Sequence, residues 1–470
     1  MPIKIIKKYG IWALILFFSF VYSLYSVVRH LKFETYIFDL GYYDQLIWQA
    51  SRGLGLHLST IEAHAFTDHF SPTILLLSPL YWIWADPIIL LLSQSIIICL
   101  GAYPIYKLSL TKTRDALFSL TISFAYISFY GIQNAITYDF HALAFSASLL
   151  AWVLWFYETK KYKLFWVSLI LLVGLQENFF ILGAAIGTFI IIKFRDYRRG
   201  LIITLTSTLL FLLLIFYIIP TLFGNSYYYL DRRLEDLNLG ELTKMLYSPQ
   251  SKIDVVFFSF LAFGFLPLLS LPSLILAGEE FLGRFLGTTN PNWWILGFHY
   301  NAPLAGILTY GAIDTVSKYF KRRLKLVAFL IFAGILLSQI RVKTDIYKMF
   351  KKDFYNISNT QNAREVLKLI PDEASVAATN DLGTQIARRK GLIFLTNCID
   401  NPNPIGEDGR RCFNITPDYI VANMDPSSPN NFYPDYNRES IASYLTFLQN
   451  SGKYHLIERK GEVYLLKKLK

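Results

Sequence analysis

Apolar stretches separated by short polar clusters fill most of the sequence. The first of them, residues 11–28, follows a basic start, and comparable runs recur as far as residue 340. Several approach the ~20 residues with which a helix crosses a bilayer. The pattern predicts a mostly α-helical fold, a polytopic bundle of about 10–12 membrane helices over residues 1–343.

One apolar run, residues 165–194, is interrupted by Gln176, Glu177 and Asn178. Basic residues flank both of its ends, so both ends should lie on the same side of the membrane. The interruption is then a turn between two short helices, which brings Glu177 into the bundle. An ionisable group at that depth is costly and usually functional. A turn or helix cap is the alternative interpretation.

The composition changes after residue 341, where the chain becomes polar and rich in Pro, Asn and Asp. Helical patterns cover residues 363–370, 384–389 and 439–449, and strand patterns cover residues 374–379, 392–395 and 419–423. Two further strand patterns flank Lys460-Gly461, which predicts a hairpin. We therefore expect residues 344–470 to form a small α/β soluble domain.

Hydrophobic residues make up 54% of the chain and charged residues 17%, below the ~25% of soluble domains. The formal net charge of +11 comes from Lys and Arg clusters between the apolar runs. This distribution follows the positive-inside rule and argues against nucleic acid as a partner. We expect a multi-pass protein of the cell (plasma) membrane, in contact with membrane lipid, with a cytoplasmic N-terminus and an extracytoplasmic C-terminal domain.

The segment of residues 30–72 is an unusual connector for two membrane helices. It is ~40 residues long, and loops of that length are usually functional or disordered. It holds four of the seven histidines and several acidic residues. Its aromatic and apolar content argues against disorder. We expect a folded loop on the outer membrane face that carries an active site.

Asp39 and Asp44 are the candidate catalytic carboxylates of this loop. Asp39 lies just beyond the first membrane helix and before Gly41, where a new helix can begin. The five-residue spacing of the two acids is poor for one helix face, so they need not act together. Helix capping is the alternative role for each.

His64, Asp68 and His69 form a second candidate site within AHAFTDHFSP. Imidazole and carboxylate groups at this spacing can bind a divalent cation such as Mg²⁺ or Mn²⁺, although the spacing matches no strong metal motif. A protonated His can instead contact a phosphate. A purely structural loop is the third interpretation.

Further polar side chains fall at the outer ends of predicted helices. They are Asp139, His141, Glu177 and His299. A lone His is more often structural, but together these groups predict a polar cavity at the outer membrane face. A lipid-linked carrier would reach such a cavity from the bilayer, and a hydroxyl acceptor would reach it from water.

Five motifs carry a resemblance to a known family: FDLGYYDQLIWQ, HAFTDHFSP, GAYPIYKLSL, GLQEN and FHYNAP. With them the chain resembles a family of predicted bacterial and archaeal membrane proteins, domain of unknown function 2079. In that family the position of Gln176-Glu177-Asn178 more commonly reads Lys-Glu-Asp, so only the Glu is retained here. The family is in turn distantly similar to glycosyltransferases of the C-type fold.

The resemblance implies an integral membrane glycosyltransferase with a polyprenyl-phosphate-linked sugar donor and an unknown acceptor. It makes Asp39 the general base and implies inversion at the sugar by analogy. Positive charge or a metal would stabilise the phosphate leaving group. The substrate- or phosphate-binding candidates are His64, Asp68, His69, Glu177, Arg284, His299 and Tyr300.

Two other functions stay open at this point. A membrane transporter or lipid flippase needs polar groups along a path through the bilayer midplane, whereas here they gather at one end. A membrane-anchored binding or assembly protein would act through the C-terminal domain. That domain holds Cys398 and Cys412, either as a disulfide or as two thiols.

Overall fold

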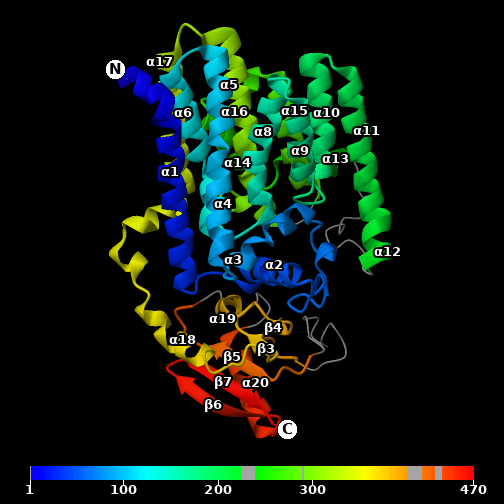
Figure 1. The fold of residues 1–470 in the computed structure, drawn as a ribbon, viewed down its shortest axis with the longest axis vertical. Helices are drawn as coiled ribbons and strands as arrows, with labels where there is room; N and C mark the ends of the chain where they lie inside the picture. The colour runs from blue at the N-terminus through cyan, green and yellow to red at the C-terminus, as the bar shows by residue number, and fades with distance from the viewer. Residues whose placement is uncertain (1, 224–238, 288–289, 400–414, 429–436, 470) are drawn as a thin grey trace. The chain divides into compact units, whose positions relative to one another are not determined.

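The computed structural model describes residues 2–223, 239–287, 290–399, 415–428 and 437–469 (Figure 1). The chain divides into two compact units. The first comprises Met1–Tyr25, Phe66–Ile74 and Leu92–Lys348. The second comprises Ser26–Ala65, Leu75–Leu91 and Met349–Lys470.

The first unit is built from helices (Figure 1). Those that belong to it wholly or in part are α1 (Pro2–Leu31), α4 (Ile88–Leu100), α5 (Ala102–Thr113), α6 (Ala116–Ile127), α7 (Tyr130–Tyr138), α8 (Ser146–Glu158), α9 (Tyr162–Val173), α10 (Phe179–Phe194), α11 (Tyr197–Leu213), α12 (Ile219–Phe223), α13 (Leu239–Tyr247), α14 (Gln250–Leu261), α15 (Leu271–Gly287), α16 (Pro303–Thr315) and α17 (Leu324–Val342). The predicted break is confirmed, because α9 ends at Val173 and α10 begins at Phe179.

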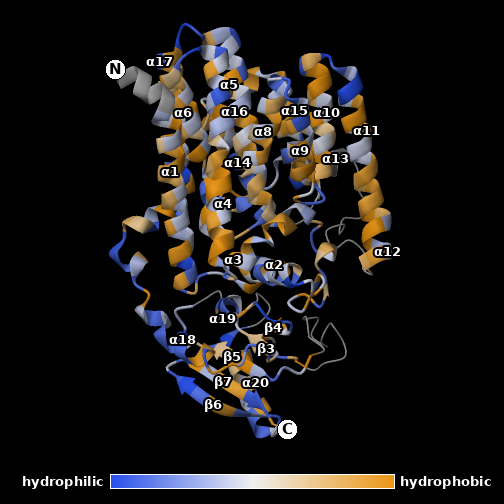
Figure 2. Cartoon of the chain, in the orientation of Figure 1, coloured by the Kyte–Doolittle hydropathy of each residue, from blue (hydrophilic) through white to orange (hydrophobic). Residues whose placement is uncertain are grey.

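Four helices of the described chain are long and apolar enough to cross a membrane, and a fifth span results if α6 and α7, bent by 42°, count as one. The four are Tyr9–Leu31, Ile88–Thr113, Tyr197–Phe223 and Leu324–Val342. Shorter apolar helices, α9 and α10 among them, accompany these spans, and Figure 2 shows the hydrophobic residues along the helices. The predicted mostly α-helical membrane fold is confirmed, while the count of about 10–12 membrane helices stays a prediction.

Charged turns meet at one end of the first unit, which we call the basic end. Lys112 of α5 pairs with Glu158, the last residue of α8, at 2.9 Å. The Tyr310 hydroxyl of α16 donates to the same Glu158 carboxylate at 2.6 Å. One turn further along α16, Asp314 forms an ion pair with Lys193 near the end of α10. These contacts place the ends of α5, α8, α10 and α16 together.

Small residues allow α10 and α11 to pack closely. A Cβ atom on Gly187 of α10 would lie only 2.6 Å from the carbonyl oxygen of Gly200 in α11. Next to this contact, the Thr204 hydroxyl donates to the Ala184 carbonyl at 3.2 Å. Close approach through small residues is the usual basis of helix association in membranes, where no hydrophobic force drives helices together.

The second unit contains a five-stranded sheet in the order β4-β3-β5-β7-β6. The strands are β3 (Val376–Ala378), β4 (Leu392–Phe394), β5 (Tyr419–Asn423), β6 (Tyr454–Lys460) and β7 (Val463–Lys468). β3 pairs in parallel with β4 and β5, whereas β7 pairs antiparallel with β5 and β6. The helices α18 (Gln361–Leu367), α19 (Asn380–Gln385) and α20 (Arg438–Asn450) accompany the sheet.

The predicted α/β elements of the C-terminal part are confirmed with one shift. The helix expected at 384–389 begins earlier, as α19 at Asn380. Its expected second half is irregular, because the Arg389 side chain folds back and donates to the carbonyl oxygens of Ile386 (2.8 Å) and Ala374 (2.9 Å). The assignment of residues 344–470 as a domain of its own stays a prediction.

Residues 30–65 of the long loop are built into this second unit, and its last residues, 66–72, belong to the first. Phe33 and Ile37 lie in the same buried core as the sheet. After them come α2 (Tyr42–Arg52), the short hairpin of β1 (His57–Leu58) and β2 (Ala63–His64), and, beyond the loop, α3 (Leu80–Ile83). The Ser59 hydroxyl donates to the Leu392 carbonyl of β4 at 2.8 Å. The loop is therefore folded, as predicted, and its core is shared with the C-terminal strands.

Candidate functional site

His69 is the centre of a polar cluster in the first unit. Its Nδ1 lies 3.1 Å from Oε1 of Glu177, in the break between α9 and α10. The other oxygen of Glu177 accepts the Phe70 backbone N–H at 2.9 Å. Nε2 of the Gln176 side-chain amide lies 2.9 Å from the same Nδ1. The structure thus brings together two predicted site residues, because the break turns Glu177 toward the segment that carries His69.

The His69 ring is held in its charged form. Its side chain is 19% exposed and that of Glu177 is 1% exposed. Burial lowers the pKa of His69, but the negative charges of Asp68 and Glu177 and the hydrogen bond to Glu177 outweigh burial and raise it to about 9. His69 is therefore an imidazolium at neutral pH. Since a cationic ring only donates hydrogen bonds, Gln176 must then face it with its amide oxygen.

His299 stacks on His141 beside this cluster. The ring centroids of the two histidines are 3.8 Å apart, and the Tyr138 ring lies 5.0 Å from His299. Burial is the main cause that lowers the pKa of His299 well below 6.5, and the positive fields of His141 and His69 add to it. A neutral imidazole thus neighbours the His69 cation. Within the described chain, Nδ1 of His299 has no hydrogen-bond partner.

Arg284 joins the cluster through the segment that carries His299. Its Nη1 donates to the Tyr300 carbonyl at 3.0 Å and to Asn301 Oδ1 at 2.9 Å, and its Nε donates to the Glu280 carbonyl at 3.0 Å. The Tyr300 ring centroid lies 4.2 Å from that of His299. Arg284 is only 6% exposed, and its Nη2 has no hydrogen-bond partner among the described residues. An unpartnered buried guanidinium N–H is costly unless a ligand accepts from it.

Gln94 of α4 fixes the position of His141. Its amide nitrogen donates to the carbonyl oxygens of Ala135 (3.2 Å) and Asp139 (2.9 Å), and its amide oxygen accepts the His141 N–H at 2.8 Å. The Asp139 carboxylate accepts the Phe140 N–H at 2.9 Å. The predicted Asp139 therefore belongs to the framework that holds His141.

Asp39 lies in the second unit, in the π-helical turn Ile37–Gly41, and is half-buried. The Ile37 N–H donates to Asn380 Oδ1 of α19 at 2.8 Å. The Thr384 hydroxyl of the same helix donates to the Thr35 carbonyl at 3.2 Å. The turn is thus held by α19, which is the kind of support that fixes a functional side chain.

Asp44 of α2 is completely buried. The Tyr81 hydroxyl of α3 donates to its Oδ1 at 2.5 Å, and Arg388 Nη1 lies 3.5 Å from its Oδ2. Burial raises the pKa of Asp44 to about 6, although Arg388 and the bond from Tyr81 oppose the rise. This environment favours a role in holding α2, α3 and the segment after α19 together.

His64 lies on β2, opposite His57 of β1 in the hairpin register. It belongs to the second unit, whereas Asp68 and His69 belong to the first. Burial and the nearby His57 lower the pKa of His64. In the described part of the chain, no three His, Cys, Asp or Glu side chains gather as they would around a metal ion.

Tyr81, Arg388 and Tyr138 are partners of site residues that the sequence analysis did not single out. Arg388 belongs to an Arg-Arg-Lys run in the polar C-terminal part, and that run was the only signal for it. Cys398 is disulfide-bonded. Cys412, the partner considered for it, lies outside the described residues.

Comparisons with known proteins support the fold. The ArnT structure from Cupriavidus metallidurans bound to undecaprenyl phosphate is similar over 98% of both chains, with a TM-score of 0.58 and 11% identity. The apo structure of the same protein is similar over 92% of this chain and 93% of its own, with a TM-score of 0.50 and 11% identity. No curated protein sequence matches the chain.

The family model for predicted membrane proteins, DUF2079, matches residues 29–465. The matched range covers nearly the whole chain, from the end of α1 to β7. The predicted family resemblance and the predicted fold resemblance are therefore both confirmed. The chain belongs to the DUF2079 family of predicted membrane proteins.

Proposed function

We propose that this protein is a membrane glycosyltransferase that takes a sugar from a polyprenyl-phosphate donor on the extracytoplasmic face. The observation that carries the proposal is the 3.1 Å contact between His69 Nδ1 and the buried Glu177 carboxylate, which raises the pKa of His69. α9 begins beside the basic end and leads away from it to the break that holds Glu177. The ArnT fold, seen with undecaprenyl phosphate in C. metallidurans, supports a ligand of the same class.

The cluster offers what a phosphate leaving group requires. A developing phosphate anion is stabilised by charged N–H donors held in a site of low dielectric. The His69 imidazolium supplies one cation, and the buried Nη2 of Arg284 supplies N–H donors without a partner among the described residues. The neutral His299, which is close enough to His69 to feel its charge, adds no repulsion. The negative charges of Asp68 and Glu177 keep His69 charged where burial alone would neutralise it.

Asp39 is the proposed general base. It takes the proton of the acceptor hydroxyl while that oxygen attacks the anomeric carbon of the sugar. The bond between that carbon and the phosphate oxygen breaks, and the polyprenyl phosphate leaves with the electron pair. A single displacement without a covalent intermediate inverts the anomeric configuration. Asp44, fully buried, positions the α2 segment that follows the Asp39 turn.

Binding of undecaprenyl phosphate to the purified full-length protein tests the anion site. His69→Gln should weaken binding at least tenfold, since a charged hydrogen bond contributes about 1.5–3 kcal/mol. His455→Gln is the matched control, because His455 is exposed on β6 of the second unit. Equal affinity of His69→Gln and wild type would remove the phosphate role of the cluster.

Asp39→Asn separates binding from chemistry. The amide keeps the size of the side chain but cannot take a proton, so undecaprenyl phosphate should bind as in wild type while sugar transfer stops. Glu34→Gln is the control within the same loop, because Glu34 pairs with Lys32 at 2.7 Å and is 41% exposed. Transfer that persists in Asp39→Asn contradicts the assignment of the base.

A further inference from the structure

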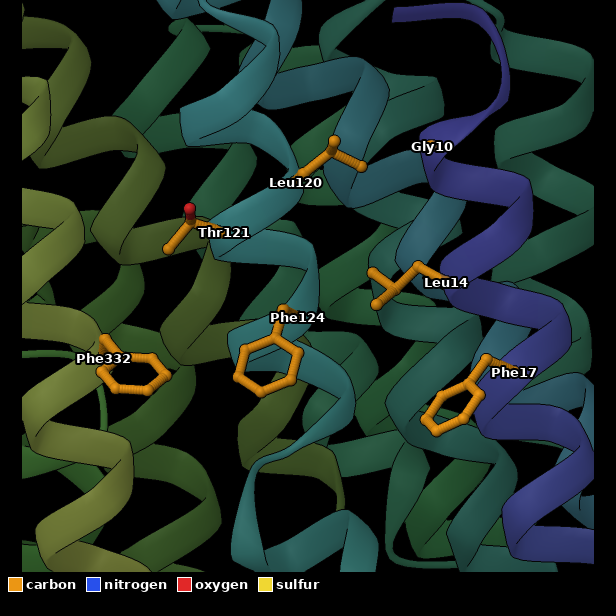
Figure 3. Close-up of a pocket in the computed structure, with 7 residues that line it drawn as sticks. All are labelled: Gly10, Leu14, Phe17, Leu120, Thr121, Phe124 and Phe332. Carbon is orange, nitrogen blue, oxygen red and sulfur yellow. The ribbon is translucent and has the colours of Figure 1, made fainter. Parts of the chain in front are cut away.

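An apolar groove lies between α1, α6 and α17 of the first unit (Figure 3). Its volume is about 520 Å³, within the about 300–1,000 Å³ of ligand sites. The lining residues are Gly10, Leu14, Phe17, Leu120, Thr121, Phe124 and Phe332. They come from all three helices, and the small Gly10 leaves room at one end.

α1 and α6 run in the same direction along the groove. The ring centroids of Phe18 and Phe124 are 5.9 Å apart. One turn further along both helices, the Tyr22 hydroxyl donates to the Ile127 carbonyl at 2.8 Å. The two contacts fix the register, so the start of α6 lies level with the part of α1 near Gly10.

α17 runs parallel to α6 on the other side of the groove. The Phe124 and Phe332 rings stack with centroids 6.5 Å apart, and the Gln339 amide donates to the Ser128 carbonyl at 2.8 Å. Phe124 and Phe332 each lie eight residues into their helix, or about 12 Å from its start. The starts of α6 and α17 therefore lie at one level above the groove.

Exposed cations surround these two helix starts at the basic end. They are Arg114, Lys321, Arg322, Arg323 and Lys325. None of them has an ion pair with another described residue. The acidic neighbours are engaged elsewhere, since Asp115 caps α6 by accepting the Phe118 N–H at 2.8 Å and Glu158 binds Lys112.

The lining of the groove favours an apolar ligand. Phe17 is 61% exposed and Phe332 is 53% exposed, so the groove opens on the surface of the helices. Its one hydroxyl needs no ligand, because Thr121 donates to the Leu117 carbonyl at 3.1 Å. An occupant with an apolar chain of at least 12 Å and an anionic head would use both the groove and the cations above it.

We propose that this groove holds an acyl chain of an anionic diacyl phospholipid whose phosphate lies among the cations at the basic end. Each cation held near the membrane surface adds to the attraction of an anionic lipid. The site is distinct from the His69 cluster, because α6 and α7 lead from the groove to His141 at the far end of the bent span. It therefore does not depend on the proposed sugar transfer.

Native mass spectrometry of the full-length protein with added lipid tests this site. Palmitoyl-oleoyl phosphatidylglycerol should bind at least tenfold more tightly than palmitoyl-oleoyl phosphatidylcholine. Thr121→Trp fills the groove and should abolish that preference. Leu117→Trp is the matched control on α6, because Leu117 is 69% exposed and does not line the groove. Unchanged preference in Thr121→Trp overturns the proposal.

A charge variant keeps the test independent of core packing. Arg114→Gln, Arg323→Gln and Lys325→Gln combined alter only exposed side chains and should reduce phosphatidylglycerol binding at least tenfold. Arg198→Gln, an exposed cation of α11, should leave it unchanged. Equal binding of the two phospholipids overturns the proposal. Displacement of bound phosphatidylglycerol by an equimolar amount of undecaprenyl phosphate would also overturn it. The same holds if the wild-type protein is a dimer and Thr121→Trp dissociates that dimer.

Discussion

The buried pair of His69 and Glu177 allows a quantitative test by a double-mutant cycle. The rise of the His69 pKa from 6.5 to about 9 corresponds to about 3 kcal/mol, at about 1.4 kcal/mol for each pKa unit. Asp68 shares this effect, but burial opposes it, so the part due to Glu177 is about 2–3 kcal/mol. We predict a coupling free energy of that size between the two side chains at pH 7.

The cycle compares the free energy of unfolding of wild type, His69→Gln, Glu177→Gln and the double variant, measured by denaturant titration in detergent micelles. Glutamine at position 177 keeps an oxygen that accepts the Phe70 N–H, so the substitution removes mainly the charge. The cycle then isolates the interaction between the two residues. The exposed pair of Lys32 and Glu34 is the control and should show about 0.5 kcal/mol or less.

The coupling must also depend on pH with a definite sign. A group whose pKa is raised by folding contributes stability that is complete below its unfolded pKa of 6.5 and is lost as pH rises through about 9. The coupling should therefore persist from pH 6 to pH 8 and approach zero at pH 10. A coupling below about 0.5 kcal/mol at pH 7, or one that is unchanged at pH 10, would refute the ion pair.

Three further predictions concern the folded framework. Arg388→Gln leaves the buried Asp44 carboxylate without its cation and should lower the free energy of unfolding by about 3 kcal/mol or more, measured at pH 7. Burial raises the Asp44 pKa to about 6, so the contribution of this group to the free energy of unfolding falls by about 3 kcal/mol as pH rises from about 4 to 6. Asp44→Asn should remove this pH dependence when the free energy of unfolding is measured across the same range. Gly187→Ala should destabilise by about 1–3 kcal/mol, because its Cβ would lie 2.6 Å from the Gly200 carbonyl oxygen. Gly278→Ala on α15, whose Cβ would meet no atom within 4 Å, should be neutral or stabilise by up to about 1 kcal/mol in the same thermal unfolding assay.

Local patterns in the sequence predicted much of this fold. The polar interruption at Gln176 separates α9 from α10, as predicted. The strand patterns of the C-terminal part form the strands β3 to β7. These features depend on residues close in sequence, where periodicity and turn chemistry act directly. The helix expected at 384–389 was displaced because the Arg389 side chain binds backbone carbonyls.

Contacts between residues far apart in the sequence could not be predicted from such local patterns. Nothing local to Ile37 indicates that it enters a core formed by strands more than 330 residues later. The same is true of the Arg388 partner of Asp44. In the first unit, Glu177 and His299 were predicted only to lie at the same level of the bundle. The ion pair to His69 and the stack on His141 required the three-dimensional arrangement.

Sugar transfer from a lipid-linked donor, with Asp39 as the base, can be tested in cells. The measurement is mass spectrometry of polyprenyl-phosphate-linked sugars and glycans in a strain without this gene, complemented with wild type, Asp39→Asn or Glu34→Gln at equal membrane levels. We predict that the donor accumulates and one glycan lacks a sugar in the Asp39→Asn strain, while Glu34→Gln restores the wild-type pattern. Identical donor and glycan profiles for Asp39→Asn and wild type would contradict it.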